Sequence, residues 1–216
     1  MGSNVAPFFQ REVAVANHAE SGETLRSFIG GKRLDNILTT IKKDDYLFIQ
    51  FSHNDQKERG EGAAAFTTYK ESLKRLIAET KKRGAIPVLV TPINRRTFDS
   101  AGKVTNSLGD YPDAVRQTAK EENVVLIDLN TMSKRFYEAL GADESKKAFV
   151  DDTHHNAYGS YESARCIVEG SRANRLDLAR FLAEDDKAFD PAKPDPIASV
   201  RIPPSPNRTN IAPEGT

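Results

Sequence analysis

Short apolar runs that alternate with helical stretches constrain the fold of this chain more than any other feature. The clearest run is Tyr46–Phe51, in which nearly every residue is apolar. A strand with apolar residues at both odd and even positions is typical of a parallel sheet that is buried on both faces. Ile86–Val90 and Val124–Leu129 are runs of the same kind, and Val13–Ala16 is a shorter one. These runs predict four strands.

Each run is followed by residues with helical spacing. After Val13–Ala16, for example, come Leu34, Ile37 and Leu38. The spacing predicts helices over about 24–41, 66–83, 110–122, 129–140 and 158–182. Parallel strands joined by helical crossovers give an α/β fold, here a three-layer α/β/α sandwich with a flavodoxin-like sheet. In such sheets, ligands bind at the carboxyl ends of the strands.

Length and composition narrow the class of protein. The 216 residues fit one α/β domain, predicted over 1–185, and seven of the eleven prolines lie in a predicted tail over 186–216. The 31 basic residues equal the 31 acidic ones, so no basic surface for nucleic acid is expected. No apolar run has membrane-spanning length, and no signal peptide is visible. The single Cys166 permits no internal disulfide, and a packed helical position is expected for it.

The segment Asp151-Asp152-Thr153-His154 is the strongest candidate for catalytic chemistry. An Asp three residues before a His can place its carboxylate beside the imidazole, which fixes the tautomer and stabilises the charged ring. The alternative is that Asp and Thr only cap the helix that follows. Taken alone, the motif leaves both interpretations open.

Other polar residues follow the predicted strands and are expected at the same carboxyl edge of the sheet. His18 and Gly22 follow Val13–Ala16, and His53 and Asn54 follow Tyr46–Phe51. The remaining members of this set are Asp55, Arg95, Arg96 and His155. Their clustering at one edge favours the catalytic interpretation of Asp151 and His154.

Three segments in this order resemble the second, third and fifth sequence blocks of the SGNH (GDSL-like) hydrolases. They are Asn17–Gly22, Phe51–Asp55 and Asp151–His154. The similarity is closest to the rhamnogalacturonan acetylesterase branch, and it extends from about Phe8 to about Pro206. The blocks are short, and their order and spacing carry the specificity.

The resemblance implies the chemistry and the role of each residue. Asn54 would donate its side-chain amide to the oxyanion, and Gly22 would donate its backbone N–H. His154 would be the general base and Asp151 its orienting partner. The reaction would be removal of acetyl groups from a pectin-type polysaccharide through a covalent acyl-serine, with no metal or cofactor. The substrate would be an acetylated polysaccharide or another ester, and the protein would be secreted or periplasmic.

The chain departs from the family pattern in two places. Ser52 stands where the family usually has Gly. The family's first block is a strand followed by Gly-Asp-Ser, whose Ser is the nucleophile, and no Gly-Asp-Ser occurs in this chain. Gly2-Ser3-Asn4 is the nearest match but lacks the preceding strand; Ser21 and Ser52 are the other candidates. We expect a truncated ancestral enzyme whose central first strand is absent. Alternatively, Ile197–Ile202, the one strand-like stretch left over, could fill that place, or Val13–Ala16 and Tyr46–Phe51 could pair directly in a four-stranded sheet.

Several interpretations stay open. Arg95 and Arg96 could bind the carboxylates of a uronic-acid polymer, or they could form a solvated loop. His53 could contact substrate, and His53 and His155 could instead support the site by packing. The first rival function is a non-catalytic relative that binds a glycan. The second is a metal-dependent hydrolase, which would use His53, Asp151, His154 and His155. The oligomeric state is undetermined by the sequence.

Overall fold

The computed structural model describes residues 5–59, 64–184 and 186–201, and these divide between two compact units. The sheet unit comprises the described residues of 18–92 and 108–127. The helical unit comprises residues 5–17 and 93–107 and the described residues of 128–201. Each unit is described by itself below.

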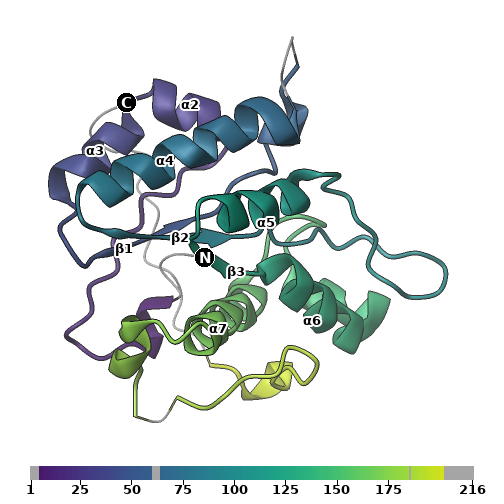
Figure 1. Cartoon of the computed structure of the whole chain (residues 1–216). Helices are drawn as coiled ribbons and strands as arrows, with labels where there is room; N and C mark the ends of the chain where they lie inside the picture. The colour runs from purple at the N-terminus through teal and green to yellow at the C-terminus, as the bar shows by residue number, and fades with distance from the viewer. Residues whose placement is uncertain (1–4, 60–63, 185, 202–216) are drawn as a thin grey trace. The chain divides into compact units, whose positions relative to one another are not determined.

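The sheet unit contains three parallel strands, β1 (Tyr46–Ile49), β2 (Ile86–Val90) and β3 (Val125–Ile127), in the order β1-β2-β3 (Figure 1). Tyr46 pairs with Ile86, and Val88 pairs with Val125. The strands are joined by helical connections, as parallel neighbours require. The predicted α/β class and the parallel sheet are therefore confirmed.

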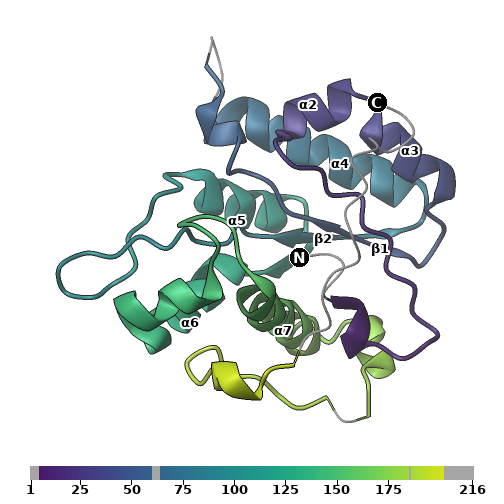
Figure 2. The ribbon, with the colours of Figure 1, turned by 180° about the vertical axis from the view of Figure 1, so that it is seen from behind.

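The helices of this unit pack on one face of the sheet (Figures 1 and 2). They are α2 (Leu25–Gly30), α3 (Arg33–Thr40), α4 (Lys70–Lys82) and α5 (Tyr111–Glu121). Their apolar stripes bury Leu34, Leu73 and Ile77 against Ile49 and Leu89. Pro112 lies in the first turn of α5, where its missing N–H has no helical partner to lose. A 3-10 turn at Asp55–Lys57 and a π-type turn at Ala65–Tyr69 precede α4.

The helical unit is built on α6 (Leu129–Glu144) and α7 (Ala157–Ala173). Asp128 caps α6, because its carboxylate accepts a hydrogen bond from the Thr131 N–H. Asn156 caps α7 in the same way through the Gly159 N–H. Gly141 has a φ of 78° and interrupts the helical geometry of α6, close to the predicted end of that helix. The 3-10 turns of this unit are Ala6–Phe8, Ser145–Ala148, Asp177–Phe181 and Ile197–Ser199.

The segment after residue 185 contacts α7 through a series of polar side chains. Arg172 pairs with Asp186, and Arg165 pairs with Asp195 at 2.5 Å. The hydroxyl of Tyr158 donates to the Asp195 carbonyl at 2.8 Å. A boundary between a domain over 1–185 and a tail over 186–216 stays a prediction, and residues 202–216 lie outside the described part of the chain.

One predicted strand is wrong, and the unassigned strand-like stretch does not form a strand in its described part. Val13–Ala16 is an irregular segment, and Val15 is among the exposed large apolar residues. The run is short and half alanine, and a strand needs a neighbour to satisfy its backbone groups. Within the described residues, none of the strand pairings or bridges includes this segment. Ile197–Ile202 is not a strand either, since Ile197–Ser199 is a 3-10 turn and Ile202 is outside the described residues.

Two other strands are shorter than predicted. β1 ends at Ile49 and not at Phe51, because the backbone turns at Ser52 with a φ of +142°. β3 ends at Ile127, because Asp128 already caps the helix that begins at Leu129. Both differences come from local backbone geometry that an apolar pattern does not report.

Candidate active site

The segment that carries Asp151 and His154 is a tight loop between the Ser145–Ala148 turn and α7. Phe149 and His155 form an antiparallel bridge across its base. The N–H of Val150 donates to the carbonyl of His154 at 2.7 Å. These contacts hold the two ends of the loop together, and the predicted pair, Asp151 and His154, lies at its tip.

Asp151 and His154 form the predicted hydrogen-bonded pair. Oδ2 of Asp151 lies 2.7 Å from Nδ1 of His154, and Oδ1 accepts the backbone N–H groups of His154 and Thr153, both at 2.6 Å. Hydrogen bonds from the His154 N–H and imidazole lower the pKa of Asp151 to about 2. The carboxylate thus stays ionised and orients the ring, which leaves Nε2 as the nitrogen that can exchange a proton with a reactant.

This pair is open to solvent, with 73 % of the His154 side chain and 55 % of the Asp151 side chain exposed. A purely structural histidine would be expected to pack or to bind a fixed partner on both ring nitrogens. The exposed imidazole beside a bound carboxylate is instead the arrangement expected of a general base.

Arg96 contacts the loop at the residue next to Asp151. Its backbone N–H donates to the Asp152 carbonyl at 2.8 Å, and its guanidinium pairs with the Asp152 carboxylate. Nη1 of Arg96 also donates to the Ala142 carbonyl at 3.3 Å. Arg95, the other predicted substrate-binding arginine, donates to the Ser107 carbonyl at 3.2 Å. Binding of substrate by either arginine stays a prediction.

His155 lies beneath the loop and packs into the helical unit. Its Nε2 lies 2.7 Å from the hydroxyl of Tyr137, and its ring lies 4.3 Å from that of Phe149. Tyr137 is fully buried, and its hydroxyl also donates to the Asn94 carbonyl at 3.2 Å. The supporting role considered for His155 agrees with this packing.

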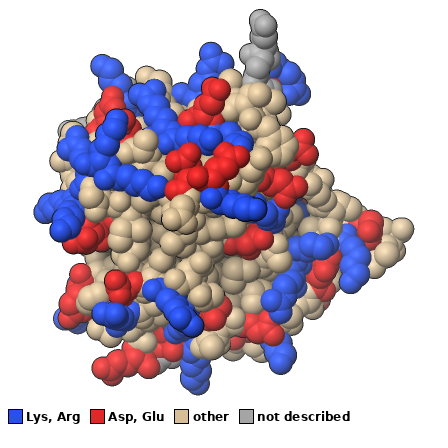
Figure 3. Space-filling model, in the orientation of Figure 1, with Lys and Arg blue, Asp and Glu red and all other residues tan. Residues whose placement is uncertain are grey.

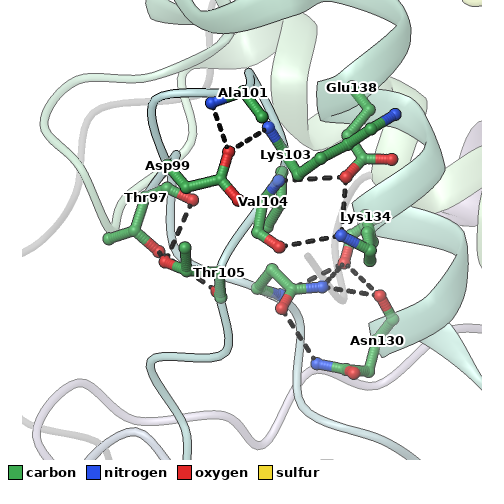
Figure 4. A network of polar contacts seen from close by, with 11 residues as sticks. Thr97, Asp99, Ala101, Lys103, Val104, Thr105, Asn130, Lys134 and Glu138 are labelled. Carbon is green, nitrogen blue, oxygen red and sulfur yellow. Dashed lines mark hydrogen bonds and ion pairs between the residues drawn. The ribbon is translucent and has the colours of Figure 1, made fainter.

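The segment that precedes and follows Arg96 is fixed on α6 by a network of polar contacts (Figure 4). Asp99 Oδ1 accepts the N–H groups of Ala101 and Lys103 and so closes the tip of the segment. The N–H of Val104 donates to Glu138 at 3.0 Å, and Lys134 donates to the Val104 carbonyl at 2.8 Å. The polar sequence of this stretch does not reveal the network, because its contacts join residues 34 and 30 positions apart.

In the sheet unit, Asn54 contacts the loop that carries Gly22. Nδ2 of Asn54 donates to the carbonyl of Glu23 at 3.3 Å, and Lys57 donates to Oδ1 of Asn54 at 2.9 Å. Gly22 is exposed and has a φ of 87°, a conformation that favours glycine. The two predicted oxyanion donors therefore lie on adjoining loops of one unit, and their roles stay predictions.

Asp55 connects these same two loops. The sequence placed it at the edge of the sheet but predicted no specific role for it. It is buried, and its Oδ1 accepts the N–H of Leu25 at 2.8 Å. Burial raises its pKa to about 6. The hydroxyls of Tyr69 and Tyr111 donate to the carbonyls of Phe51 and Asp55 at 3.1 and 3.0 Å. Its place next to Asn54 was the only signal in the sequence.

Ser52 and the remaining histidines complete the predicted set. Ser52 has a φ of +142° and is only 2 % exposed, so a non-glycine residue occupies a conformation that glycine adopts freely. His53 is half-buried and His18 is exposed. Gly2-Ser3-Asn4 lies outside the described residues. No group of three or more His, Cys, Asp or Glu is arranged to hold a metal ion in the described part of the chain.

None of the helices in the described ranges is long and apolar enough to cross a membrane. Positive and negative side chains are interspersed on the face of the molecule that Figure 3 displays. An ion pair between α4 and α5 joins Lys70 to Glu121 at 2.7 Å.

Comparison with known proteins gives consistent matches. Residues 2–160 match the GDSL-like lipase/acylhydrolase family. The chain is 39 % identical over 196 residues to rhamnogalacturonan acetylesterase RhgT of Bacillus subtilis, covering 84 % of each chain. It is 34 % identical over 192 residues to the probable rhamnogalacturonan acetylesterase YesY of the same organism, covering 85 % of this chain and 88 % of that one.

A solved structure agrees with the sequence matches. The protein YXIM_BACsu from Bacillus subtilis superposes with a TM-score of 0.74 at 27 % identity, over 82 % of this chain and 50 % of that one. This chain thus spans about half the length of that relative. The likeness confirms the expected SGNH-type α/β fold. By family match and by identity to its relatives, the chain belongs to the GDSL-like lipase/acylhydrolase family and is an esterase.

Proposed function

We propose that this chain is a carbohydrate acetylesterase in which His154 is the general base and Asp151 its orienting partner. The observation that carries the proposal is the 2.7 Å contact between Asp151 Oδ2 and His154 Nδ1 on an exposed loop. Two relatives above 30 % identity that bear the name rhamnogalacturonan acetylesterase support acetyl esters of a pectin-type polysaccharide as substrate.

The proposed reaction is acyl transfer in two steps. A serine hydroxyl oxygen bonds to the acetyl carbonyl carbon while its proton passes to Nε2 of His154. The ester C–O bond then breaks, and the sugar oxygen leaves with that proton. Water, deprotonated by the same nitrogen, hydrolyses the acetyl-serine and regenerates the hydroxyl. Asp151 stabilises the imidazolium in each step, and the Gly22 N–H and the Asn54 amide are the proposed donors to the oxyanion.

The identity of the nucleophile is part of the proposal that needs its own test. Ser21 is exposed and precedes Gly22, which makes its hydroxyl accessible. Ser52 is buried on a strained backbone, which argues against attack by its hydroxyl. Ser3 lies outside the described residues. We propose that Ser21 or Ser3 replaces the family's nucleophile, or that the nucleophile is absent from this chain.

Substrate recognition is proposed for Arg95 and His53. Arg95 is half-buried, and its guanidinium suits the carboxylates of a uronic-acid polymer. His53 directly precedes the proposed oxyanion donor Asn54. A polysaccharide substrate of this kind supports a secreted or periplasmic location, and no nucleic-acid or membrane partner is proposed.

The substrate is tested by acetate release from acetylated rhamnogalacturonan, with acetylated xylan as the matched control polymer. We expect preferential release from the pectin-type polymer by the wild type and none by His154→Ala. A fluorophosphonate probe, followed by peptide mass spectrometry, identifies the labelled serine. Binding of the polymer without acetate release or labelling, in the folded protein, would support the non-catalytic glycan-binding relative and refute the esterase assignment.

A further inference from the structure

We infer that Arg96 is a positioning residue for the proposed base. From the segment between β2 and α5, it holds the loop that carries Asp151 and His154 and so fixes the direction of the His154 imidazole. The inference rests on the proposed function of His154. It assigns Arg96 a role different from direct contact with substrate.

The contacts of Arg96 converge on a single residue of that loop. Its backbone N–H and its guanidinium bind the carbonyl and the carboxylate of Asp152, respectively. Asp152 is the neighbour of Asp151, so the two contacts fix the backbone from which the orienting carboxylate projects. The third contact, from Nη1 to the Ala142 carbonyl, connects the same guanidinium to the end of α6.

The loop needs such a contact because packing does not hold its tip. The side chains of Asp151, Asp152 and His154 are 55 %, 65 % and 73 % exposed, whereas that of Arg96 is 18 % exposed. An Asp–His hydrogen bond at this exposure gains little over water and loses side-chain entropy when it forms. A fixed backbone lowers that entropic cost, which is the basis of preorganisation in catalytic sites.

Arg96 is itself held in place. Figure 4 shows its segment fastened to α6 through Val104, Lys134 and Glu138. At the start of the segment, Nδ2 of Asn94 donates to the Asn130 carbonyl at 2.6 Å. The buried Tyr137 hydroxyl contacts the carbonyl of Asn94 and Nε2 of His155, so the segment and the loop are also joined from below. The loop is thus held at two points. One is the contact between His155 and the buried Tyr137, and the other is the contact between Asp152 and Arg96 near the exposed tip.

The first test does not depend on activity. Carbon-13 NMR titration of the Asp151 carboxyl is compared between wild type, Arg96→Ala, Asp152→Ala and Arg135→Ala. Arg135→Ala is the matched control, because it removes an exposed arginine–aspartate pair, Arg135 with Asp190 at 2.8 Å, from the same unit. We expect the Asp151 pKa, about 2 in wild type, to rise toward the ordinary aspartate value in Arg96→Ala and Asp152→Ala only. Asp152 is exposed, so Asp152→Ala keeps the test valid if Arg96→Ala fails to fold.

The second test separates positioning from substrate binding. On a small aryl acetate we expect Arg96→Ala and Asp152→Ala to lower kcat about ten-fold or more with little change in KM, and Arg96→Lys to recover part of it. An unchanged Asp151 pKa in the folded variants would overturn the inference, as would a higher KM for uronic-acid polymers with normal kcat. If the wild type has no activity, the proposed function fails, and the NMR comparison still decides the role of Arg96.

Discussion

Asp151 contacts His154 twice, since Oδ2 lies 2.7 Å from the imidazole Nδ1 and Oδ1 lies 2.6 Å from the backbone nitrogen of the same histidine. The second contact fixes the turn, and the first fixes the ring. An Asp-x-x-His spacing therefore does more than bring two residues near one another, because the carboxylate organises the backbone on which its partner stands.

Replacing Asp151 should damage catalysis far more than stability. Asp151→Asn can still accept the backbone N–H groups, but its amide favours the wrong tautomer or orientation of the ring. We expect kcat to fall by about a hundred-fold or more, in line with the loss of the orienting aspartate in other triads. The measurement is kcat on an aryl acetate, together with the urea midpoint of unfolding. A variant with normal kcat would show that the carboxylate serves the turn alone.

Ser52→Gly should stabilise the protein. The φ of +142° at Ser52 costs a non-glycine residue about 1–3 kcal/mol, and glycine would recover that cost less its greater entropy in the unfolded chain. We expect a net gain of about 1 kcal/mol in the free energy of unfolding. Urea denaturation measures it, and Ser100→Gly in an exposed turn serves as the control. A loss of stability in Ser52→Gly would mean that the hydroxyl or its packing outweighs the strain.

Stability should fall with rising pH because of Glu162. This side chain is fully buried in α7, and burial raises its pKa to about 7. Well below pH 4.5 the group is protonated in both the folded and the unfolded state and contributes no pH dependence. Between pH 4.5 and 7 the unfolded state loses its proton first, so stability declines by about 3 kcal/mol in all.

Glu162→Gln should remove that decline, whereas the exposed Glu144→Gln should not. Urea denaturation at pH 4.5, 6 and 8 measures the slope for each variant. The buried Asp55, whose pKa is raised to about 6, contributes a slope of the same sign, so a residual decline is expected in Glu162→Gln. Equal slopes for wild type and Glu162→Gln would exclude Glu162 as the source.

Gly159→Ala should disturb the loop that carries His154. A Cβ at position 159 would lie 2.1 Å from the Ala148 carbonyl oxygen and 2.6 Å from the His155 ring, so α7 and the loop would have to separate. We expect a loss of about 2 kcal/mol or more in the free energy of unfolding. Gly30→Ala, whose Cβ would meet nothing within 4 Å, is the matched control and should be neutral or stabilising. Equal effects in the two variants would contradict the packing.

Sequence reasoning located the sheet and the Asp–His pair because both have local signatures. β2 was predicted with the correct bounds, and the Asp151–His154 contact depends on a three-residue spacing. The sequence-based prediction failed where a strand depends on pairing with another strand or where its end depends on a backbone dihedral angle. Val13–Ala16 resembles a strand but pairs with none of the strands within the described residues. The end of β1 is set by the φ of Ser52, which apolar periodicity does not reveal.

The contacts of Arg96 and Asp55 were also beyond sequence reasoning. Arg96 and Asp152 are separated by 56 positions, and only the fold brings their charges together. Asp55 was noted as part of a motif, but its burial and its hydrogen bond to the Leu25 N–H depend on how α2 packs. Long-range polar contacts of this kind need the structure.

The central claim is that His154 is the base of an esterase. It is tested most directly by the rate of 4-nitrophenyl acetate hydrolysis for wild type, His154→Ala and the exposed control His18→Ala, each verified as folded by circular dichroism. The account predicts turnover by wild type and His18→Ala that is reduced by about a thousand-fold in His154→Ala. Full turnover by His154→Ala, or no turnover by the folded wild type, would contradict it.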